Sequence, residues 1–376
     1  MSFLENKKVA QDLSLNTSMI YFNVAGLSPF NPAVQQEIAT TLEQFSQLLY
    51  SEEGIHYYRE TARRCRQKLA QWLQVEDVQH IAFVPNATTA SWLVLSRIHW
   101  KPGDHILTTT HENATVLKEI FALQSRGIHV HTLDSKSPPE LVTKIEHLLT
   151  SQQVRAIIIS HVSHIDGRIF PVEQLAKLTQ THQALLIIDG AQAVGHIPVN
   201  FHDWQPDAYF FPGHKWCAGP MGTGALILGE QWTKHDERSR DRGKESSQPP
   251  WLDFELGTQN IGLIAGFAKA CTIKHQEGLG TEVLESFREE VRQTFSRIPG
   301  IEILGWEGPH SPGILSFSCL DKWTEARLHS KSHAVVWKTF QLPGNPERTG
   351  IRLSWSPDTT KTDQESVRTI LHNILS

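Results

Sequence analysis

The stretch FFPGHKWCAGPMGTG, residues 210–224, holds a lysine in surroundings suited to catalysis. His214 and Lys215 follow an apolar run, and three glycines come soon after them. A lysine becomes a nucleophile or a general base when its neighbours lower its pKa, and glycines let backbone approach closely. Two readings stand at this point: a tight surface turn, or a lysine held against a phosphorylated cofactor with His214 near the phosphate.

A second apolar run, LLIID, ends in Asp189, with Gln192 three residues later. A carboxylate at the end of a buried strand is costly unless it meets a cation or caps a helix. It either caps the next helix or pairs with a protonated ring nitrogen, as pyridoxal phosphate requires. Lys215 follows Asp189 after one further apolar run, so the two residues suit a cofactor held between them.

The elements that must position these residues alternate along the chain. Amphipathic stretches that predict helices lie between short apolar runs that predict buried strands. Such alternation predicts an α/β fold with a mostly parallel sheet and helices on both faces. Ligands bind at the carboxyl ends of strands in such sheets. The seven runs are HIAFVP, DHILTTT, IHVHTLD, VRAIIIS, ALLIID, DAYFFP and GALILG.

A length of 376 residues predicts two domains. We expect a large cofactor-binding domain over residues 16–260 and a smaller C-terminal α+β domain over residues 261–376, joined by the N-terminal segment 1–15. The smaller domain has strand candidates in GIEILGW, GILSFSC and HAVVWKTF and a closing helix in TDQESVRTILHNIL. Residues 232–250 are charged and poor in apolar side chains, which predicts an exposed loop.

Composition narrows the function classes. The formal net charge of −5 argues against a broad nucleic-acid or anionic-membrane surface. No run of about 18 apolar residues predicts a membrane span, and the first residues lack a signal peptide's apolar region. Four cysteines without CxxC spacing indicate reduced thiols in a cytoplasmic protein. Twenty histidines form no HExxH motif, so no metal is expected.

LLIIDGAQAVG and DAYFFPGHKWCAGPMGTG resemble the class V aminotransferase and cysteine desulfurase family of fold type I pyridoxal phosphate enzymes. The resemblance covers nearly the whole chain, with its motifs in the same order. It implies pyridoxal 5′-phosphate as the cofactor, Lys215 as the lysine that bonds to it, and Asp189 as the partner of its ring nitrogen. Gln192 and His214 are implied as further cofactor contacts.

Two more segments resemble the family's phosphate-binding parts. In FVPNATTASW, Ala87, Thr88 and Thr89 open a helix, and a helix N-terminus is a sound phosphate site. FELGTQN resembles the segment whose threonine, here Thr258, reaches the phosphate of the neighbouring subunit. This resemblance implies a homodimer with each site built from both subunits.

Substrate contacts are implied at both ends of the chain. YFNVAGLSP, which includes Gly26, resembles the family's substrate-side N-terminal segment. IRLSWSP resembles the segment whose arginine, here Arg352, clamps the substrate carboxylate, a pairing that a guanidinium makes in bidentate fashion. WKT places Lys338 where many relatives carry a second arginine, so carboxylate recognition is expected to differ.

The chain departs from the family at two cofactor positions. Counted from Gly103 and Asp104, the family's ring-stacking histidine falls on Asn113, whereas His111 lies two residues earlier. We keep both as candidates, since an amide neither stacks nor moves protons as an imidazole does. His164 stands where the family has an asparagine that touches the cofactor's phenolic oxygen.

The absence of one cysteine favours a C–S lyase reaction over a desulfurase reaction. Cysteine desulfurases of this family need a nucleophilic cysteine in a loop that falls here on residues 340–350, and FQLPGNPERTG has none. The chain therefore looks more like the family's cysteine or cystine C–S lyases, in which Lys215 takes the α-proton and the products are pyruvate and ammonia. An aminotransferase or epimerase is the alternative, and a binding protein without catalysis is a third.

Overall fold

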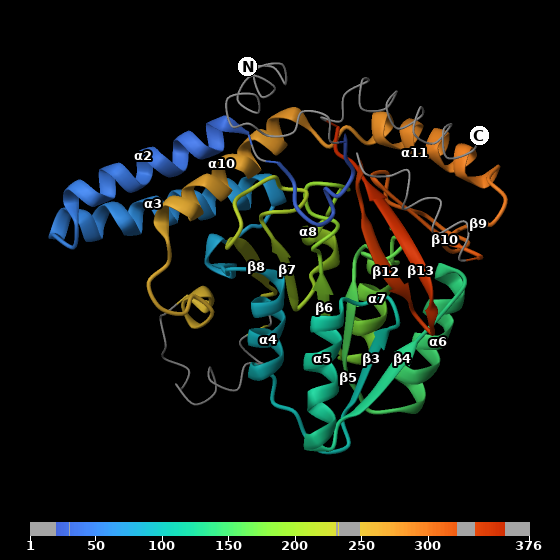
Figure 1. Cartoon of the computed structure of the whole chain (residues 1–376). Coiled ribbons are helices and arrows are strands. Elements are labelled where there is room, and N and C mark those ends of the chain that lie inside the picture. The colour runs from blue at the N-terminus through green and yellow to red at the C-terminus, as the bar shows by residue number, and fades with distance from the viewer. Residues whose placement is uncertain (1–19, 30, 231, 233–248, 322–334, 358–376) are drawn as a thin grey trace.

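The computed structural model describes residues 20–29, 31–230, 232, 249–321 and 335–357. Its centre is a seven-stranded sheet in the order β2-β8-β7-β6-β5-β3-β4 (Figure 1). The strands are β2 (Ile81–Phe83), β3 (His105–Thr109), β4 (His129–Leu133), β5 (Val154–Ser160), β6 (Leu185–Asp189), β7 (Ala208–Pro212) and β8 (Gly224–Leu228). Each strand lies within one of the seven apolar runs, which confirms the predicted strands.

Strand direction explains where a site can form. Strands β7, β6, β5, β3 and β4 run parallel, and β8 runs antiparallel to both β7 and β2. Strand β2 therefore points the same way as the parallel strands. The mostly parallel α/β sheet is confirmed, and the carboxyl ends of β2, β3, β5, β6 and β7 meet at one edge.

Helices cover both faces of this sheet (Figure 1). Alternate residues of β5 show the division: Ile157 and Ile159 pack into one apolar cluster, and Ile158 packs into the other. The cluster of Ile158 includes residues of α4 (Ala87–Arg97) and α5 (Ala114–Ala122). The opposite cluster includes residues of α3 (Glu52–Leu73), α6 (Pro138–Ser151), α7 (Val172–His182) and α10 (Ile261–Glu277). The remaining short helices are α8 (Phe201–Trp204), η1 (Val78–His80), η2 (Leu123–Arg126) and η4 (Pro250–Asp253).

Helix α10 packs along α3 and α2 (Pro32–Leu48), away from the small domain. A Cβ at Gly262 or Gly266 would lie 2.4 Å from a side-chain carbon of Leu42 or Ile38, so these glycines allow the helices to approach closely. Phe267 and its neighbours on α10 belong to the core of the large sheet. The apolar face of α10 therefore completes the large core, and the domain boundary at residue 261 stays a prediction.

A second, antiparallel sheet has the order β12-β13-β10-β9. Its strands are β9 (Ile301–Ile303), β10 (Ile314–Cys319), β12 (Lys338–Leu342) and β13 (Asn345–Ser354). Leu284, Phe287 and Phe295 of α11 (Thr281–Ser296) share an apolar cluster with this sheet, and Phe22 from the N-terminal segment joins them. Strand β1 (Ile20–Tyr21) pairs in parallel with β11 (Val335–Val336). The strands expected in the three C-terminal runs are confirmed.

Residues 340–350 were expected to form a loop, and this expectation is wrong. They belong to a hairpin in which β12 pairs with β13, and Leu342 pairs with Asn345 across the turn. Gly344 in that turn has a φ of 72°, which favours glycine. The family resemblance implied a loop here, whereas Pro343 and Gly344 form only the tight connection between two paired strands.

Three expected segments lie outside the described residues, wholly or in part: most of the 232–250 loop, the closing helix at 362–375 and the N-terminal segment 1–15. In the parts of the chain that are described, no helix is both long and apolar enough to cross a membrane. Within the same ranges, no three side chains gather in an arrangement that could ligate a metal.

Candidate active site

The site residues gather at the carboxyl edge of the large sheet. Asp189 is the last residue of β6, and Lys215 follows β7 by three positions. His164 comes after β5, His111 after β3, and Ala87 begins the helix after β2. Since these strands all point the same way, their following loops converge, as the sequence predicts for a parallel sheet.

Asp189 and Lys215 form the charged centre of this edge. Asp189 is 5% exposed, and one of its carboxylate oxygens accepts a hydrogen bond of 2.8 Å from the amide of Ala191. Burial raises the pKa of Asp189, whereas the nearby Lys215 lowers it. Burial lowers the pKa of Lys215 to about 8, and Asp189 opposes that shift. A lysine with this pKa is poised to act as a nucleophile or a base near neutral pH.

Close packing within the loop holds Lys215 in place. The amide of Gly213 donates to the carbonyl of Thr223 at 2.7 Å, and the amide of Gly219 donates to the carbonyl of Gly213 at 2.8 Å. A Cβ on Gly213 would lie 2.3 Å from the hydroxyl of Thr223. The amide of Ser28 donates to the carbonyl of His214 at 2.8 Å. Gly213 and Gly219 therefore let the loop fold tightly on itself.

Two histidines beside Lys215 have unused polar atoms. The Nδ1 atoms of His164 and His214 are buried and make no hydrogen bond within the described residues. Burial, followed by the charges of Arg352 and Lys215, lowers the pKa of His164 to about 3, so its ring is neutral. Buried polar atoms normally have partners. These two atoms are therefore available to a polar cofactor.

The start of helix α4 offers a phosphate site. The side chain of Asn86 caps the helix by accepting from the amide of Thr89 at 2.8 Å. The first amides of a helix, here including those of Ala87 and Thr88, have no partner within the helix and favour an anion. The hydroxyl of Thr88 lies 3.1 Å from the hydroxyl of Thr115 at the start of α5.

His111 and Asn113 have different surroundings. The side-chain oxygen of Asn113 caps α5, where it accepts from the amide of Thr115 at 2.9 Å and from its hydroxyl at 2.7 Å. His111 is buried, and its Nδ1 lies 3.4 Å from the hydroxyl of Ser163 and 3.9 Å from a carboxylate oxygen of Asp166. Burial lowers the pKa of His111 although Asp166 raises it. The carboxamide of Asn113 is already used to cap α5. We therefore favour His111 as the side chain beside the cofactor ring.

Arg352 reaches this edge from β13 with an uncompensated charge. It is 5% exposed, and it donates to the carbonyl of His164 at 2.6 Å and to the side-chain oxygen of Asn23 at 3.2 Å. Both acceptors are neutral, and no acidic side chain in the described ranges pairs with it. Its Nε is buried without a partner there. Burial lowers the pKa of Arg352 to about 10, so the guanidinium stays charged at neutral pH and is suited to bind an anion.

The other predicted substrate residues support Arg352 or lie beside it. A Cβ on Gly26 would lie 2.8 Å from the side-chain nitrogen of Asn23, so this glycine leaves room for the residue that holds Arg352. Lys338 of β12 is the cross-strand partner of Arg352 and is exposed. Directly opposite residues place their side chains on the same face of a sheet, so Lys338 adds a second positive charge there.

Of two further predicted cofactor residues, Gln192 bonds to other protein groups and Thr258 lies on the surface. Gln192 is 3% exposed, and its carboxamide accepts from the indole nitrogen of Trp216 at 2.6 Å and donates to the carbonyl of Ala25 at 3.0 Å. Thr258 is exposed and lines a surface hollow of about 780 Å³ between α2, α3 and residues 249–259. None of the other predicted site residues lines that hollow.

Sequence reasoning missed Glu112 and Asn23. Glu112 is 3% exposed and accepts hydrogen bonds from the hydroxyls of Thr109 at 2.5 Å and Ser160 at 2.6 Å. Burial raises the pKa of Glu112 to about 7, and the nearby Asp189 adds to the increase. A carboxyl group two residues after the DHILTTT run was a usable signal for Glu112. Asn23 had no such signal, because its partner Arg352 lies at the other end of the chain.

The thiols do not reach this edge as nucleophiles. None of the four cysteines forms a disulfide, and all four are buried: Cys65, Cys217, Cys271 and Cys319. Cys217 is close to Lys215 in sequence, but its sulfur faces the carbonyl of Val194 at 3.5 Å. Cys319 lies within β10 and the small apolar core. A cysteine with such surroundings is normally inert.

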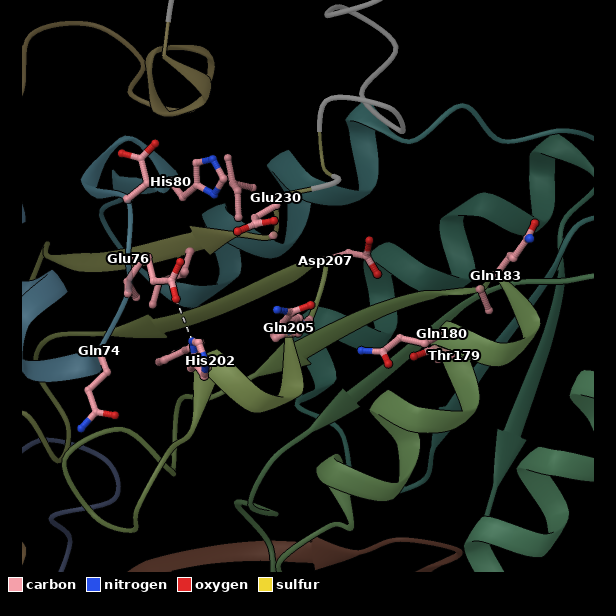
Figure 2. A pocket seen from close by; sticks show the side chains of 18 residues that line it. Gln74, Glu76, His80, Thr179, Gln180, Gln183, His202, Gln205, Asp207 and Glu230 are labelled. Atoms are coloured by element: carbon pink, nitrogen blue, oxygen red, sulfur yellow. Dashed lines mark ion pairs between the residues drawn. The ribbon is translucent and has the colours of Figure 1, made fainter.

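A further hollow of about 500 Å³ lies at the opposite edge of the sheet (Figure 2). Residues just before β2, β6 and β7 line it, and Figure 2 shows the ion pair between Glu76 and His202 at 2.9 Å. Glu230 and Asp207 add two more carboxylates. None of the predicted site residues lines this hollow.

Known proteins resemble this chain in sequence and in fold. The chain is 31% identical over 259 residues to a probable cysteine desulfurase of Chlamydia muridarum, a match that covers 64% of each chain and so less than two thirds of that relative. It is 27% identical over 335 residues to a probable cysteine desulfurase of Pyrococcus abyssi, covering 82% of this chain and 81% of the relative. The cystine C–S lyase C-DES, solved in complex with its reaction product cysteine persulfide, matches with a TM-score of 0.83 at 21% identity, over 97% of this chain and 99% of that one. At this identity the structural likeness shows the fold.

Residues 20–329 match the family described as aminotransferase class-V. The match includes the seven strands of the large sheet, the Lys215 loop and helix α4, and it ends before Arg352. The chain therefore belongs to the class-V aminotransferase family, whose cofactor is pyridoxal phosphate.

Proposed function

We propose that this chain is a pyridoxal phosphate-dependent enzyme that breaks the C–S bond of a cysteine-type amino acid. One observation carries the proposal: Lys215, with a pKa of about 8, and Arg352, with no acidic partner in the described ranges, share one edge of the sheet. A base for the α-proton and a cation for the α-carboxylate are what an amino acid substrate requires. The relatives named as cysteine desulfurases and as a cystine C–S lyase favour a sulfur substrate.

The residues at this edge fit the cofactor. Lys215 would bond to its aldehyde carbon, and Asp189 would pair with its ring nitrogen. The amides of Ala87 and Thr88 would hold the phosphate with the free Nδ1 of His214, and His164 would face the ring. When bound, pyridoxal phosphate supplies an electron sink for the charge left on the α-carbon.

Three side chains of this protein bind the substrate and move its protons. Arg352 binds the substrate carboxylate and fixes the amino acid with its α-carbon toward Lys215. The amine of Lys215 removes the α-proton, for which a pKa of about 8 is well matched. Asp189 would hold a proton on the ring nitrogen of the cofactor, because a buried carboxylate needs a nearby cation to stay ionised.

The fate of sulfur separates elimination from persulfide chemistry. A desulfurase mechanism needs a thiol on the enzyme to accept the sulfur atom, and all four thiols of this chain are buried. The hairpin at residues 340–350 contains no cysteine. We therefore infer that the sulfur leaves with the substrate's own substituent and that the remaining three-carbon fragment yields pyruvate and ammonia.

A panel of amino acids tests the reaction. The cofactor-loaded protein is incubated with L-cysteine, L-cystine, S-substituted cysteines and L-alanine, and pyruvate, ammonia and sulfur products are measured. Elimination predicts equal amounts of pyruvate and ammonia from the sulfur substrates and none from L-alanine. Conversion of the cofactor to its amine form, reversed by a keto acid, would instead establish aminotransfer. Alkylating the folded protein with iodoacetamide should leave turnover unchanged, since no thiol takes part.

We also propose a homodimer in the cytoplasm. The hollow beside Thr258 is bordered by the exposed apolar side chains of Tyr50, Leu252 and Ile55. An apolar surface of this kind is typical of a protein interface. A second copy seated there would bring Thr258 toward the partner's phosphate site. Four reduced cysteines fit a cytoplasmic location.

A further inference from the structure

His196 occupies a fully buried position between the Lys215 loop and the small sheet. It is 1% exposed and lies in the loop after β6. Its ring stacks on the indole of Trp216, the residue next to Lys215, with ring centroids 3.5 Å apart and planes 11° apart. Trp216 itself is 2% exposed. The ring of His196 is therefore fixed against the backbone that carries Lys215.

The hydrogen bonds of His196 allow a single tautomer. Its Nδ1 lies 3.0 Å from the carbonyl oxygen of Gln192, which can only accept. Its Nε2 accepts a hydrogen bond of 2.9 Å from the amide of Gly313, which can only donate. The ring is therefore neutral, with its proton on Nδ1. Both ring nitrogens are used within the protein, so the mechanism proposed above gives His196 no direct part.

Gly313 connects His196 to the strand pair that holds Arg352. Strand β10 begins at the next residue, and its Ser316 pairs with Arg352 of β13. A Cβ on Gly313 would lie 2.7 Å from Nε2 of His196 and 2.9 Å from the indole of Trp216. The glycine thus lets β10 begin directly against the stacked rings. The hydrogen bond that Gly313 donates to His196 joins the start of this strand pair to a ring stacked beside Lys215.

A second path joins the same two parts. Gln192 accepts from the indole nitrogen of Trp216 and donates to the carbonyl of Ala25. The amide of Ala25 donates at 2.9 Å to the hydroxyl of Ser354, two residues beyond Arg352. Because this path does not involve the ring of His196, a changed His196 leaves one connection between the Lys215 loop and β13 in place.

We propose that His196 is a positioning residue that sets the separation of Lys215 and Arg352 through its hydrogen bond with Gly313. The inference rests on the proposed function in one respect, that Lys215 and Arg352 act on the same substrate. A change in that separation should impair recognition of the substrate carboxylate more than it impairs cofactor attachment. Small misplacements of a binding group are costly because the bound geometry must match the reacting atoms.

Two variants with a side-chain amide at position 196 test the two hydrogen bonds of His196 separately. In His196→Asn, the side-chain amide lies near the position of Nδ1 and can still donate to Gln192, but it does not reach Gly313. In His196→Gln, the carboxamide oxygen reaches the position of Nε2 and can accept from Gly313. The two variants resemble each other in polarity, so a difference between them reports the bond to Gly313.

Binding of L-cysteine and of L-cysteine methyl ester is then measured on the cofactor-loaded proteins by absorbance. The ester lacks the carboxylate that Arg352 binds. We expect His196→Asn to weaken L-cysteine binding by roughly tenfold and ester binding by less than about threefold, whereas His196→Gln stays near wild type. An equal loss for both compounds, or equal losses in both variants, would overturn the proposal.

Hydrogen exchange supplies a readout that needs no substrate. Amide exchange in the peptide containing Gly313 should be faster in His196→Asn than in wild type and close to wild type in His196→Gln. Unchanged exchange in His196→Asn would overturn the contact on which the inference depends. A wild-type protein that responds to neither cysteine compound would refute the proposed function instead, and the exchange experiment would still decide whether His196 holds Gly313.

Discussion

The guanidinium of Arg352 on β13 donates a hydrogen bond of 2.6 Å to the carbonyl oxygen of His164, which follows β5. This bond joins the small sheet to the cofactor edge of the large one. The same guanidinium bonds to Asn23, 329 residues away in sequence. Both acceptors are neutral, so the positive charge of Arg352 remains available to a ligand.

Replacing Arg352 with lysine should weaken substrate recognition. A hydrogen bond to a charged group contributes about 1.5–3 kcal/mol, so we expect kcat/KM for L-cysteine to fall by roughly 10- to 150-fold. Lysine keeps the charge but loses the planar fork that matches a carboxylate. Arg348→Lys on the same strand is the matched control, because Arg348 pairs with Glu302 on the surface. Undiminished kcat/KM in Arg352→Lys would contradict the assignment of this residue.

Lys215 should bond to the cofactor with an unusual pH dependence. Only the neutral amine attacks an aldehyde, and the pKa of Lys215 is lowered from 10.5 to about 8. The rate of attachment to the cofactor-free protein should therefore rise up to about pH 8 and then level off. Asp189 raises this pKa, so Asp189→Asn should move the midpoint to lower pH. The rate is followed by absorbance, with borohydride reduction and mass spectrometry locating the bond.

Lys215→Ala and Lys338→Ala are the paired controls for that measurement. The first should show no reduced adduct at position 215, and the second should behave as wild type because Lys338 lies exposed on β12. A rate in the wild type that keeps climbing tenfold for each pH unit well above pH 9 would show that the surroundings of Lys215 do not lower its pKa.

The sequence alone predicted the positions of residues that lie at or just after the end of a strand. Lys215 and Asp189 come at the ends of short apolar runs, and parallel pairing brings such ends together whatever the details of packing. The contact between Arg352 and Asn23 depends on how two sheets dock, and no local pattern encodes that. The hydrogen bond between His196 and Gly313 likewise joins segments 117 residues apart in sequence.

The loop expected at residues 340–350 came from the family resemblance and is wrong. Cross-strand pairing makes Pro343 and Gly344 the turn of a hairpin. Helix α10 comes where the smaller domain is expected to begin, and that boundary stays a prediction. Its packing on α2 and α3 depends on Gly262 and Gly266, and the fit of those surfaces appears only in three dimensions.

Glu112 should make the stability of the protein depend on pH. Its pKa is raised from 4.5 to about 7 in the folded state, mainly by burial. The folded protein therefore holds this proton where the unfolded chain has released it. The resulting stabilisation is fully present below about pH 4.5 and is lost as the pH rises through about 7. Glu112→Gln cannot ionise and should lack this loss.

Urea unfolding at several pH values measures that effect. Between about pH 5 and pH 8, the free energy of unfolding of Glu112→Gln should rise relative to wild type by about 1–3 kcal/mol. Glu43→Gln, on the exposed face of α2, serves as the control and should track the wild type. Parallel curves for Glu112→Gln and the wild type would mean that the buried carboxyl does not hold its proton as inferred.

Thr258 should act on the site of the other subunit. Lys215→Ala dimers should be inactive, and Thr258→Ala dimers should be impaired if the hydroxyl binds phosphate. In a mixed dimer, one site would lack Lys215 and the partner's hydroxyl, while the other would have both. Mixing the two variants after mild dissociation should therefore restore up to about half of wild-type activity per mixed dimer.

If Thr258 served its own subunit, mixing would restore nothing beyond the activity of Thr258→Ala. Sedimentation of the same mixture checks that dimers have formed, and a monomer that binds the cofactor and turns over substrate would contradict the shared site.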